Sequence, residues 1–415
     1  MKESLVVPDE VLNSKRNIFM NPWITPGIIV SVQTKFSLYT DWKDTVTLEN
    51  PAGDHNLYDK YSKFRKKLKY VIRSAKSLYY GKKFQKHNGD MKKTWQLINE
   101  IRGKTKKKVK PYFMVDGQLV QDRRIISDKF NSYFTNIAES MNDDMAQNLT
   151  QNSTEIPPPE KFFHKSVMHS IFTEECSVEE ISTIISELES GKSSDIPIKV
   201  IKHCNTLLSP LISNFINSFL RHGIFPRNLK VGRITPIFKK DNPQIFNNYR
   251  PVSTLPIFGK IFEKVIYNRL QSFLSAKNVI YDNQFGFRKR HSTTHAINYS
   301  IQNITSDLAK KKHVLGIFID LSKAFDTINH DILMKKLWNY GVRGKFHELL
   351  KNYLTDRFQY TEIFNEKSSL NPIKFGVPQG SVLGPLLFIL YINDIINSSQ
   401  DGQFVLFADD TNISL

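Results

Sequence analysis

The chain ends in Phe404-Val405-Leu406-Phe407-Ala408-Asp409-Asp410-Thr411-Asn412-Ile413-Ser414-Leu415, where two adjacent carboxylates stand between two apolar runs. Apolar and β-branched residues alternate on both sides of the pair, which predicts two short strands joined by a tight turn. Asp409 and Asp410 would then lie exposed at the tip of a β-hairpin. Adjacent carboxylates repel each other and are costly to bury without a cation. An ordinary Asp-Asp surface turn is the alternative interpretation.

A third carboxylate, Asp320, follows the apolar run 314–319, whose composition is typical of a buried strand. One strand end and one hairpin tip can bring carboxylates from separate elements together. Phosphoryl transfer by two metal ions needs such carboxylates around cations about 3.5–4 Å apart, and Mg²⁺ prefers carboxylate oxygens as ligands. Asp320, Asp409 and Asp410 are therefore candidate ligands of a divalent metal.

Both acidic segments resemble motifs of a known enzyme family. Phe407-Ala408-Asp409-Asp410 resembles the catalytic box of reverse transcriptases, and residues 318–326 resemble their first palm motif, in the form closest to LINE-type (non-LTR) retrotransposons. The resemblance implies an RNA-directed DNA polymerase that adds deoxynucleotides to a primer 3′-hydroxyl. Its partners would be an RNA template, a DNA primer and deoxynucleoside triphosphates. The resemblance also implies two Mg²⁺ ions, or Mn²⁺ in their place, held by Asp320, Asp409 and Asp410.

Composition restricts the class of protein. The 415 residues are enough for two or three domains, and 40% of them are hydrophobic. Two cysteines exclude a disulfide framework and a cysteine-rich zinc site. No apolar stretch could span a bilayer and the charged start lacks a signal-peptide core, so we expect an intracellular protein, in the nucleus or cytoplasm, without a membrane partner. The net charge of +18 favours nucleic acid as a partner, with an acidic membrane surface or an acidic protein as alternatives.

A basic segment precedes the acidic motifs. After the weakly patterned residues 1–56, apolar residues recur at three- and four-residue spacing, which predicts an amphipathic helix: Tyr61, Phe64, Leu68, Val71, Ala75 and Leu78. Lysines and arginines crowd its other face and continue to Lys110, so residues 57–138 are interpreted as a basic helical region. The segment from Leu57 to Lys110 is expected to bind nucleic acid without sequence preference. A solvated helix pair without a ligand is the alternative. In LINE-type proteins, a region of this kind lies between an upstream endonuclease and the polymerase.

The fold class expected is α+β, with polymerase fingers and a ferredoxin-like palm sheet backed by helices. Polar residues and a proline run in 139–177 predict a linker and the main domain boundary. The reverse transcriptase domain would then occupy 178–415, with fingers at about 178–312 and palm at about 313–415. The resemblance implies a helical thumb after the catalytic hairpin and an endonuclease upstream. Neither is recognised, so we expect a truncated fragment and make no prediction about its oligomeric state.

The family resemblance assigns nucleotide contacts to two further segments. Lys239 and Arg250 stand at the ends of a predicted fingers hairpin and would reach the incoming triphosphate, where a guanidinium can bind phosphate in a bidentate way. Gln379 and Gly380 belong to a Pro-Gln-Gly loop that precedes a predicted helix. The resemblance places this loop near the nucleotide sugar. Phe325, five residues after Asp320, would exclude a 2′-hydroxyl, and a simple core phenylalanine is its alternative role.

Residues 284–292 combine aromatic side chains with cations, a composition that suits template binding and base stacking. Arg288 and Arg290 are the candidate template contacts. His291 and His295 are spaced for a metal pair, although capping or packing is the favoured interpretation. Asp326 and Thr327 are predicted to cap a helix over 328–337.

Two other functions are compatible with these motifs. An RNA-dependent RNA polymerase shares a palm of this type, but Phe325 and Ala408 argue against it. A nucleic-acid-binding relic of a retrotransposon, without catalytic activity, would carry the same residues.

Overall fold

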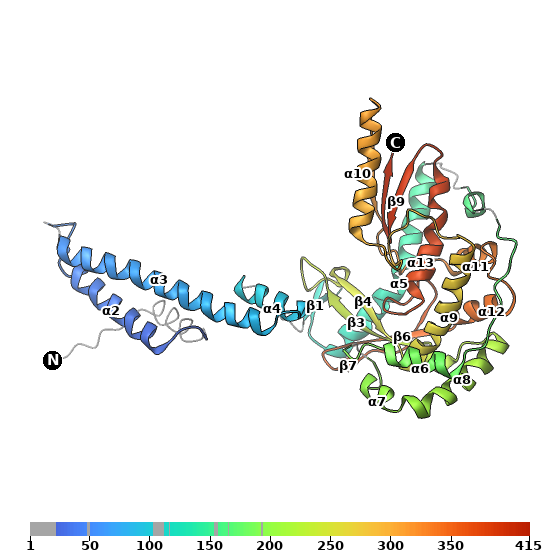
Figure 1. Ribbon diagram of the computed structural model, residues 1–415, viewed down its shortest axis with the longest axis horizontal. Coiled ribbons are helices and arrows are strands. Elements are labelled where there is room, and N and C mark those ends of the chain that lie inside the picture. The colour runs from blue at the N-terminus through green and yellow to red at the C-terminus, as the bar shows by residue number, and fades with distance from the viewer. Residues whose placement is uncertain are drawn as a thin grey trace. The chain divides into compact units, whose positions relative to one another are not determined.

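The structure, a computed structural model, describes residues 22–47, 50–102, 112–115, 117–152, 157–164, 166–191 and 194–415. It contains two compact units, Met1–Lys108 and Val109–Leu415 (Figure 1). In the described part of the chain, no helix combines the length and the apolar character needed to cross a membrane.

Three helices form the first unit: α2 (Pro26–Lys43), α3 (His55–Lys86) and α4 (Met91–Ile101). The long helix predicted from the apolar spacing is α3, whose first N–H groups are capped by Asp54. Trp42 of α2 stacks parallel to Tyr61 of α3 with ring centroids 6.2 Å apart. Of the α3 side chains only those of Leu68 and Tyr80 are buried, so the basic side chains of this helix remain on the surface.

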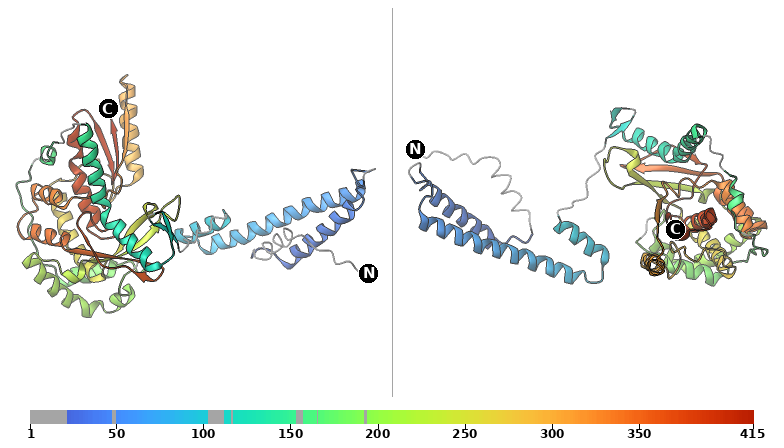
Figure 2. Two further views of the ribbon diagram at one scale, coloured as in Figure 1. Left: turned by 180° about the vertical axis from the view of Figure 1, so that it is seen from behind. Right: turned by 90° about the horizontal axis from the view of Figure 1, so that it is seen from above.

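The second unit begins with β1 (Phe113–Val115), β2 (Gln118–Val120) and α5 (Arg123–Asn152). Helix α5 runs beside β6 (Arg357–Ile363), β7 (Glu366–Lys367) and β8 (Asn371–Ile373) (Figure 2). The chain is thus helical to Asn152, where the sequence predicted a linker from residue 139. The division between units lies at Lys108 and Val109, rather than within 139–177.

A buried apolar stripe explains why α5 belongs to this unit. Four of its apolar residues repeat at helical spacing and are almost fully buried: Ile126, Phe130, Phe134 and Ile137. The Phe130 ring makes an edge contact with Tyr249 of β4 (Tyr249–Thr254), with centroids 5.0 Å apart. The spacing predicts a helix but does not reveal which surface covers it, and here that surface is a sheet more than a hundred residues away in sequence.

Five strands form the larger sheet, in the order β4-β3-β6-β7 with β8 also paired to β6. Strand β3 (Val231–Phe238) is antiparallel to β4 and parallel to β6. The β3–β4 pair is the hairpin predicted from the sequence, in which Lys239 follows the first strand and Arg250 belongs to the second.

Three antiparallel strands form the smaller sheet, in the order β5-β10-β9: β5 (Gly316–Asp320), β9 (Gln403–Phe407) and β10 (Asp410–Ser414). The sequence predicted that β5 would be buried, and this was wrong. Every residue of β5 is exposed, and Phe318 is 79% exposed. Strand β5 lies at the sheet edge and pairs with β10 alone, which leaves its apolar side chains uncovered.

One apolar core joins most helices of the second unit. They are α6 (Val178–Glu187), α7 (Ile198–His203), α8 (Asn205–His222), α9 (Ile257–Ala276), α11 (His330–Asn339), α12 (Gly344–Leu354) and α13 (Gly384–Ile392). Short 3-10 turns complete the unit: η1 (Pro159–Phe162), η2 (Arg227–Leu229), η3 (Phe246–Asn248) and η4 (Asn393–Ser398). A buried ion pair of 2.5 Å between Lys336 and Asp394 ties α11 to η4.

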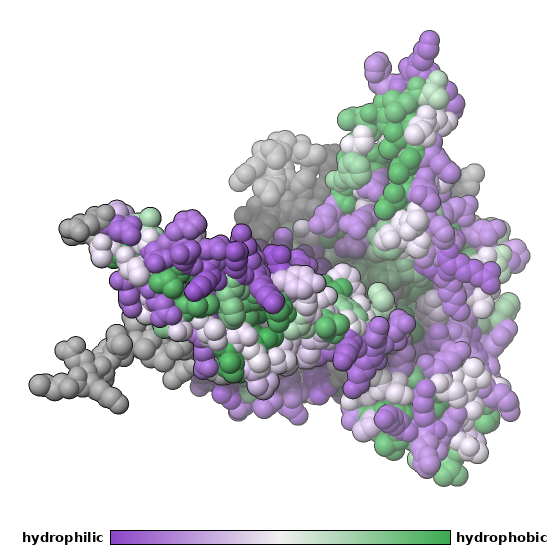
Figure 3. All heavy atoms as spheres, turned by 60° about the vertical axis from the view of Figure 1, so that its left-hand side comes forward, coloured by the Kyte–Doolittle hydropathy of each residue, from purple (hydrophilic) through white to green (hydrophobic). Residues whose placement is uncertain are grey.

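Helix α10 (Thr293–Ala309) lies beside β9 and exposes a row of apolar side chains. Ile297, Ile301 and Leu308 are each more than half exposed. Figure 3 shows hydrophobic surface gathered over α10 and the neighbouring strands.

Candidate active site

The hairpin predicted at the end of the chain is formed by β9 and β10. Phe407 pairs with Asp410, so Ala408 and Asp409 form a two-residue turn. On the other side of β10, Asp410 is the direct antiparallel partner of Asp320. The sheet register therefore brings the three aspartates to one end of the sheet.

The carboxylates influence one another electrostatically. Partial burial, followed by the charges of Asp409 and Asp320, raises the pKa of the Asp410 carboxyl above its ordinary value. Within the described residues, no three His, Cys, Asp or Glu side chains are gathered closely enough to hold a metal ion. The oxygen donors and their unrelieved repulsion nevertheless fit a hard divalent cation, because such an ion would neutralise the repulsion and draw the side chains together.

A cavity of about 800 Å³ opens beside the aspartates. Its size is in the range of small-molecule sites. The three aspartates line it together with Lys239, Arg250, Lys323, Phe325, Asp326 and Gln379. The structure therefore places most of the residues that the sequence singled out around one space.

The cations of this cavity come from two elements. Lys239 and Arg250 lie at the loop end of the β3–β4 hairpin, where Lys239 N donates to Asn248 O at 2.8 Å. Lys240 follows Lys239 and also lines the cavity, and Lys323 lies in the turn after β5. Burial lowers the pKa of Lys323, and the neighbouring charges of Lys239 and Arg250 lower it further, while Asp326 opposes them. Lys323 is thus close enough to Lys239 and Arg250 to be repelled by their charges, and such a gathering of cations suits a polyanionic ligand.

Sequence reasoning did not single out Lys323. The available signal was its place in the quoted motif, three residues after Asp320. Its backbone adopts φ +54°, in the left-handed region that residues with a Cβ rarely occupy. Its ammonium group lies 5.7 Å from the ring centre of Tyr133.

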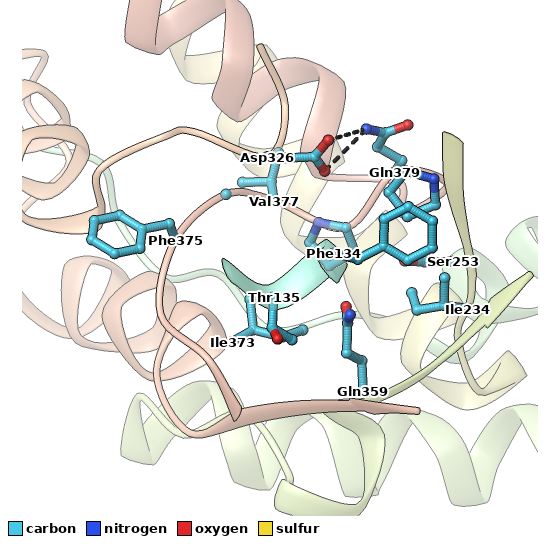
Figure 4. A pocket seen from close by; sticks show the side chains of 13 residues that line it. Phe134, Thr135, Ile234, Ser253, Asp326, Gln359, Ile373, Phe375, Val377 and Gln379 are labelled. Carbon is cyan, nitrogen blue, oxygen red and sulfur yellow. Dashed lines mark hydrogen bonds between the residues drawn. The ribbon is translucent and has the colours of Figure 1, made fainter. Parts of the chain in front are cut away.

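Asp326 lies behind the cavity and holds Gln379. The Gln379 amide Nε2 donates to both carboxylate oxygens of Asp326, at 3.0 and 2.9 Å (Figure 4). Burial raises the pKa of Asp326 to about 6. A small void of about 40 Å³ lies next to this pair, bordered also by Phe134 and Gln359.

The prediction that Asp326 caps a helix was wrong. Helix α11 begins at His330, and its cap is Asn329, whose Oδ1 accepts from Ile332 N at 3.1 Å. The chain forms turns over residues 322–326 before the helix starts, and this places the Asp326 carboxylate against the Pro-Gln-Gly loop instead.

Phe325 contacts other aromatic rings and also borders the cavity. Its ring stacks on Phe388 of α13 with centroids 4.7 Å apart and meets the edge of Phe287 at 5.9 Å. It also lines the cavity. The ring is therefore fixed by the core while part of it faces the space beside the aspartates.

The loop that carries Gln379 and Gly380 is anchored on both sides. Gly380 has φ +117°, and a Cβ there would lie 2.6 Å from Ser253 O of β4. Ser253 N donates to Gln379 O at 2.7 Å. Further along, Val382 N donates at 2.6 Å to Glu263, a carboxyl whose pKa is raised by complete burial. Gly380 thus allows the backbones to approach closely.

The candidate template residues lie in a separate loop. Arg288 Nη1 donates to the carbonyls of Tyr281, Asp282 and Gln284 at 3.0–3.1 Å, so its guanidinium holds its own loop together. Arg290 is exposed. His291 and His295 have ring centroids 6.5 Å apart. In the described part of the chain, they belong to no group of three or more His, Cys, Asp or Glu side chains that could hold a metal ion.

Comparisons with known proteins agree with this geometry. Residues 237–415 match the family model for reverse transcriptase (RNA-dependent DNA polymerase). The chain is 34% identical over 226 residues to a probable RNA-directed DNA polymerase from transposon BS of Drosophila melanogaster, an alignment that covers 52% of this chain and 24% of that protein. It is 29% identical over 265 residues to the RNA-directed DNA polymerase from mobile element jockey of the same fly, covering 61% of this chain and 29% of that protein.

A solved structure of apo telomerase from Candida tropicalis, truncated from the C-terminal domain, aligns with 51% of this chain and 49% of its own. Sequence identity is 16% and the TM-score is 0.33, which is too low to support an argument about the fold.

The chain therefore carries a reverse transcriptase domain, which the family model matches from the end of β3 onward. Its Drosophila relatives are RNA-directed DNA polymerases of mobile elements, and this similarity is consistent with a LINE-type (non-LTR) retrotransposon enzyme. The family uses divalent metal ions, a nucleic acid template and nucleotide substrates. The chain spans about a quarter of the length of the two relatives described, 24% and 29%.

Proposed function

We propose that this chain is an RNA-directed DNA polymerase that adds deoxynucleotides to the 3′-hydroxyl of a DNA primer on an RNA template. One observation carries the proposal: Asp410 lies opposite Asp320 and next to Asp409, and all three border a cavity that also holds cations. Carboxylates that can hold metals and cations that can hold phosphates are the two requirements of nucleotidyl transfer.

Asp320, Asp409 and Asp410 would hold two Mg²⁺ ions, or Mn²⁺ in their place. When bound, these ions supply activation of the primer hydroxyl and stabilisation of the charge that develops on the transferred phosphoryl group. The chain contributes positioning and charge rather than a covalent intermediate.

The cations of the cavity would bind the incoming triphosphate. Arg250 can hold phosphate oxygens with a bidentate guanidinium, while Lys239 and Lys323 act as point charges. Phe325 would form the floor below the sugar and exclude a 2′-hydroxyl. Gln379, fixed by Asp326, and Gly380 would border the sugar, and Arg290 would contact the template backbone. Arg288 would act on the template indirectly, by shaping the loop that carries Arg290.

We further propose that the two sheets are the fingers and palm of a polymerase. The β3–β4 hairpin with its sheet would form the fingers. The β5-β10-β9 sheet, with α10 packed beside β9, would form a ferredoxin-like palm. The α5 helix and the strands before it would belong to the fingers, because α5 packs on the larger sheet.

Primer extension tests the proposal. Purified chain is incubated with an RNA template, a DNA primer, Mg²⁺ and either deoxynucleotides or ribonucleotides. We expect incorporation of deoxynucleotides that Asp410→Asn abolishes, while the matched change Asp401→Asn, on an exposed aspartate outside the cavity, leaves it intact.

Two results would contradict the proposal. Preferential incorporation of ribonucleotides would indicate an RNA-dependent RNA polymerase. Tight binding of the primed template without any incorporation would indicate a nucleic-acid-binding relic.

A further inference from the structure

The buried amide of Gln284 lies directly against the turn that carries the aspartates. Gln284 is 1% exposed, and its Oε1 accepts from Gly286 N at 2.8 Å and from Ala408 N at 3.1 Å. Ala408 is the first residue of the turn between β9 and β10, so its N–H has no partner in the strand ladder. A buried N–H group is costly to leave unpaired. Gln284 therefore supplies the hydrogen bond that this turn needs.

Backbone pairing fixes the position of this amide. Phe285 N donates to Leu406 O at 2.7 Å, and Leu406 N donates to Asn283 O at 2.9 Å. Gln284 thus forms a parallel bridge with Leu406, at the free edge of β9. This pairing places the Gln284 side chain beside the turn after Phe407.

Gly286 allows the two segments to approach this closely. A Cβ at position 286 would lie 2.1 Å from Ala408 N and 2.8 Å from Ala408 Cα. Ala408 itself has φ +56°, a left-handed conformation that a residue with a Cβ rarely adopts. Such a conformation persists only when surrounding contacts hold it, and Gln284 and Gly286 supply two of those contacts.

Arg288 closes the same segment through its hydrogen bonds to the carbonyls of Tyr281, Asp282 and Gln284. Residues 283–288 therefore form a loop that packs against the turn of Ala408 and Asp409. The side-chain hydrogen bond to the turn is made by Gln284 Oε1, whereas Gln284 Nε2 is buried without a hydrogen-bond partner in the described structure.

We propose that Gln284 is a positioning residue for the metal-binding aspartates. Its Oε1 holds the turn so that Asp409 and Asp410 stay beside Asp320. The inference rests on the proposed function, since it concerns aspartates that hold a metal. Hydrogen bonds that orient metal ligands typically change metal affinity by about 10- to 100-fold when they are removed. Loss of the Gln284 acceptor should weaken metal binding by a similar factor.

Direct Mn²⁺ binding to the full chain tests this inference, with free Mn²⁺ measured by electron paramagnetic resonance. Gln284→Met has similar length and volume but no strong acceptor, and we expect about 10- to 100-fold weaker binding. Gln284→Glu keeps an oxygen for both N–H groups, whether protonated or ionised, so it should bind within about threefold of the wild type. If Gln284→Met does not fold by circular dichroism, Gln284→Asn replaces it, because its amide is too short to reach Ala408.

Gln359→Met is the matched control. Gln359 is also a buried glutamine, 7% exposed, its Nε2 donates to Asn131 Oδ1 at 3.2 Å, and it does not line the cavity beside Asp320, Asp409 and Asp410. It should lose stability without losing Mn²⁺ affinity. The inference is overturned if Gln284→Met binds Mn²⁺ as the wild type does, or if Gln359→Met weakens binding equally. Wild-type binding that does not depend on Asp410, tested with Asp410→Asn, would instead overturn the proposed function and the inference with it.

Discussion

At the scale of single residues, Asp326 connects the two motifs that border the cavity. Its carboxylate accepts the Gln379 amide, and burial raises its pKa from 3.8 to about 6. Between these two pH values the folded chain binds more protons at this group than the unfolded chain does. The free energy of unfolding therefore falls as pH rises from about 4 to about 6, by up to about 3 kcal/mol. Asp326 thus holds Gln379 at a cost in stability at neutral pH.

Asp326→Asn should remove this pH dependence. The variant keeps one oxygen for Gln379 Nε2 and has no ionisable group, so its stability relative to the wild type should increase as pH rises from 4 to 7. Urea unfolding at several pH values measures the difference. Parallel pH profiles for the two proteins would mean that Asp326 titrates as an ordinary exposed carboxyl.

Phe325 is the residue proposed to select the sugar. Phe325→Val shortens the side chain that faces the cavity, so ribonucleotide incorporation should rise at least about tenfold relative to deoxynucleotide incorporation. Single-nucleotide extension measures the ratio. Phe388→Leu is the control, because Phe388 stacks on Phe325 but does not line the cavity. A similar ratio in both variants would reduce Phe325 to a packing residue.

At the scale of elements, α5 belongs to the second compact unit, although the sequence placed the start of that domain at residue 178. Its side chains fasten it to the larger sheet through polar as well as apolar contacts. Ser127 Oγ donates to Thr361 O at 2.7 Å, and Asn131 Nδ2 donates to Ser369 O at 2.8 Å. Buried hydrogen bonds of this kind specify one docking position. These contacts join α5 to residues of the larger sheet and its adjoining turn that follow it by more than two hundred residues.

Phe130→Ala should destabilise the second unit strongly. Phe130 is fully buried and contacts the rings of Phe113, Phe246 and Tyr249. Its truncation is expected to cost about 3–5 kcal/mol, measured by chemical unfolding. Phe215→Ala, at a phenylalanine that is 46% exposed on α8, should cost far less. Equal losses would indicate that α5 is not part of the cooperative unit.

At the scale of the whole molecule, charge is the dominant feature. The chain carries a net charge of +18, and α3 displays many of its cations. In the described residues, no ion pair involves Lys66, Lys67, Lys69 or Arg73 of this helix, while Lys63 pairs with Asp59. Tyr70 stands among them and is 72% exposed. Cations with an interleaved aromatic ring suit single-stranded nucleic acid.

Replacing Lys66, Lys67, Lys69 and Arg73 together by Gln should reduce the salt dependence of RNA binding. Each lost phosphate contact lowers the slope of log affinity against log salt by about 0.7 for a single strand. Lys310, Lys311 and Lys312 at the end of α10 provide a control cluster, in which Lys310 and Lys312 pair with Asp307. RNA affinity is measured between about 50 and 200 mM salt for the α3 variant and for the matching variant of the control cluster. The same slope of log affinity against log salt in both would exclude α3 as a binding surface.

The sequence by itself determined the local elements and the chemistry that they carry. Periodicity located α3, the β3–β4 hairpin and the β9–β10 hairpin, and it placed Asp320 at a strand end, because these patterns depend on near neighbours. The register that pairs Asp410 with Asp320, the docking of α5, the exposure of β5, the partnership of Asp326 with Gln379 and the contact of Gln284 with Ala408 were decided by tertiary structure. Each of these joins residues that are distant in sequence. A local pattern predicts that a side chain will be buried or paired, but only the tertiary structure determines which residue it contacts.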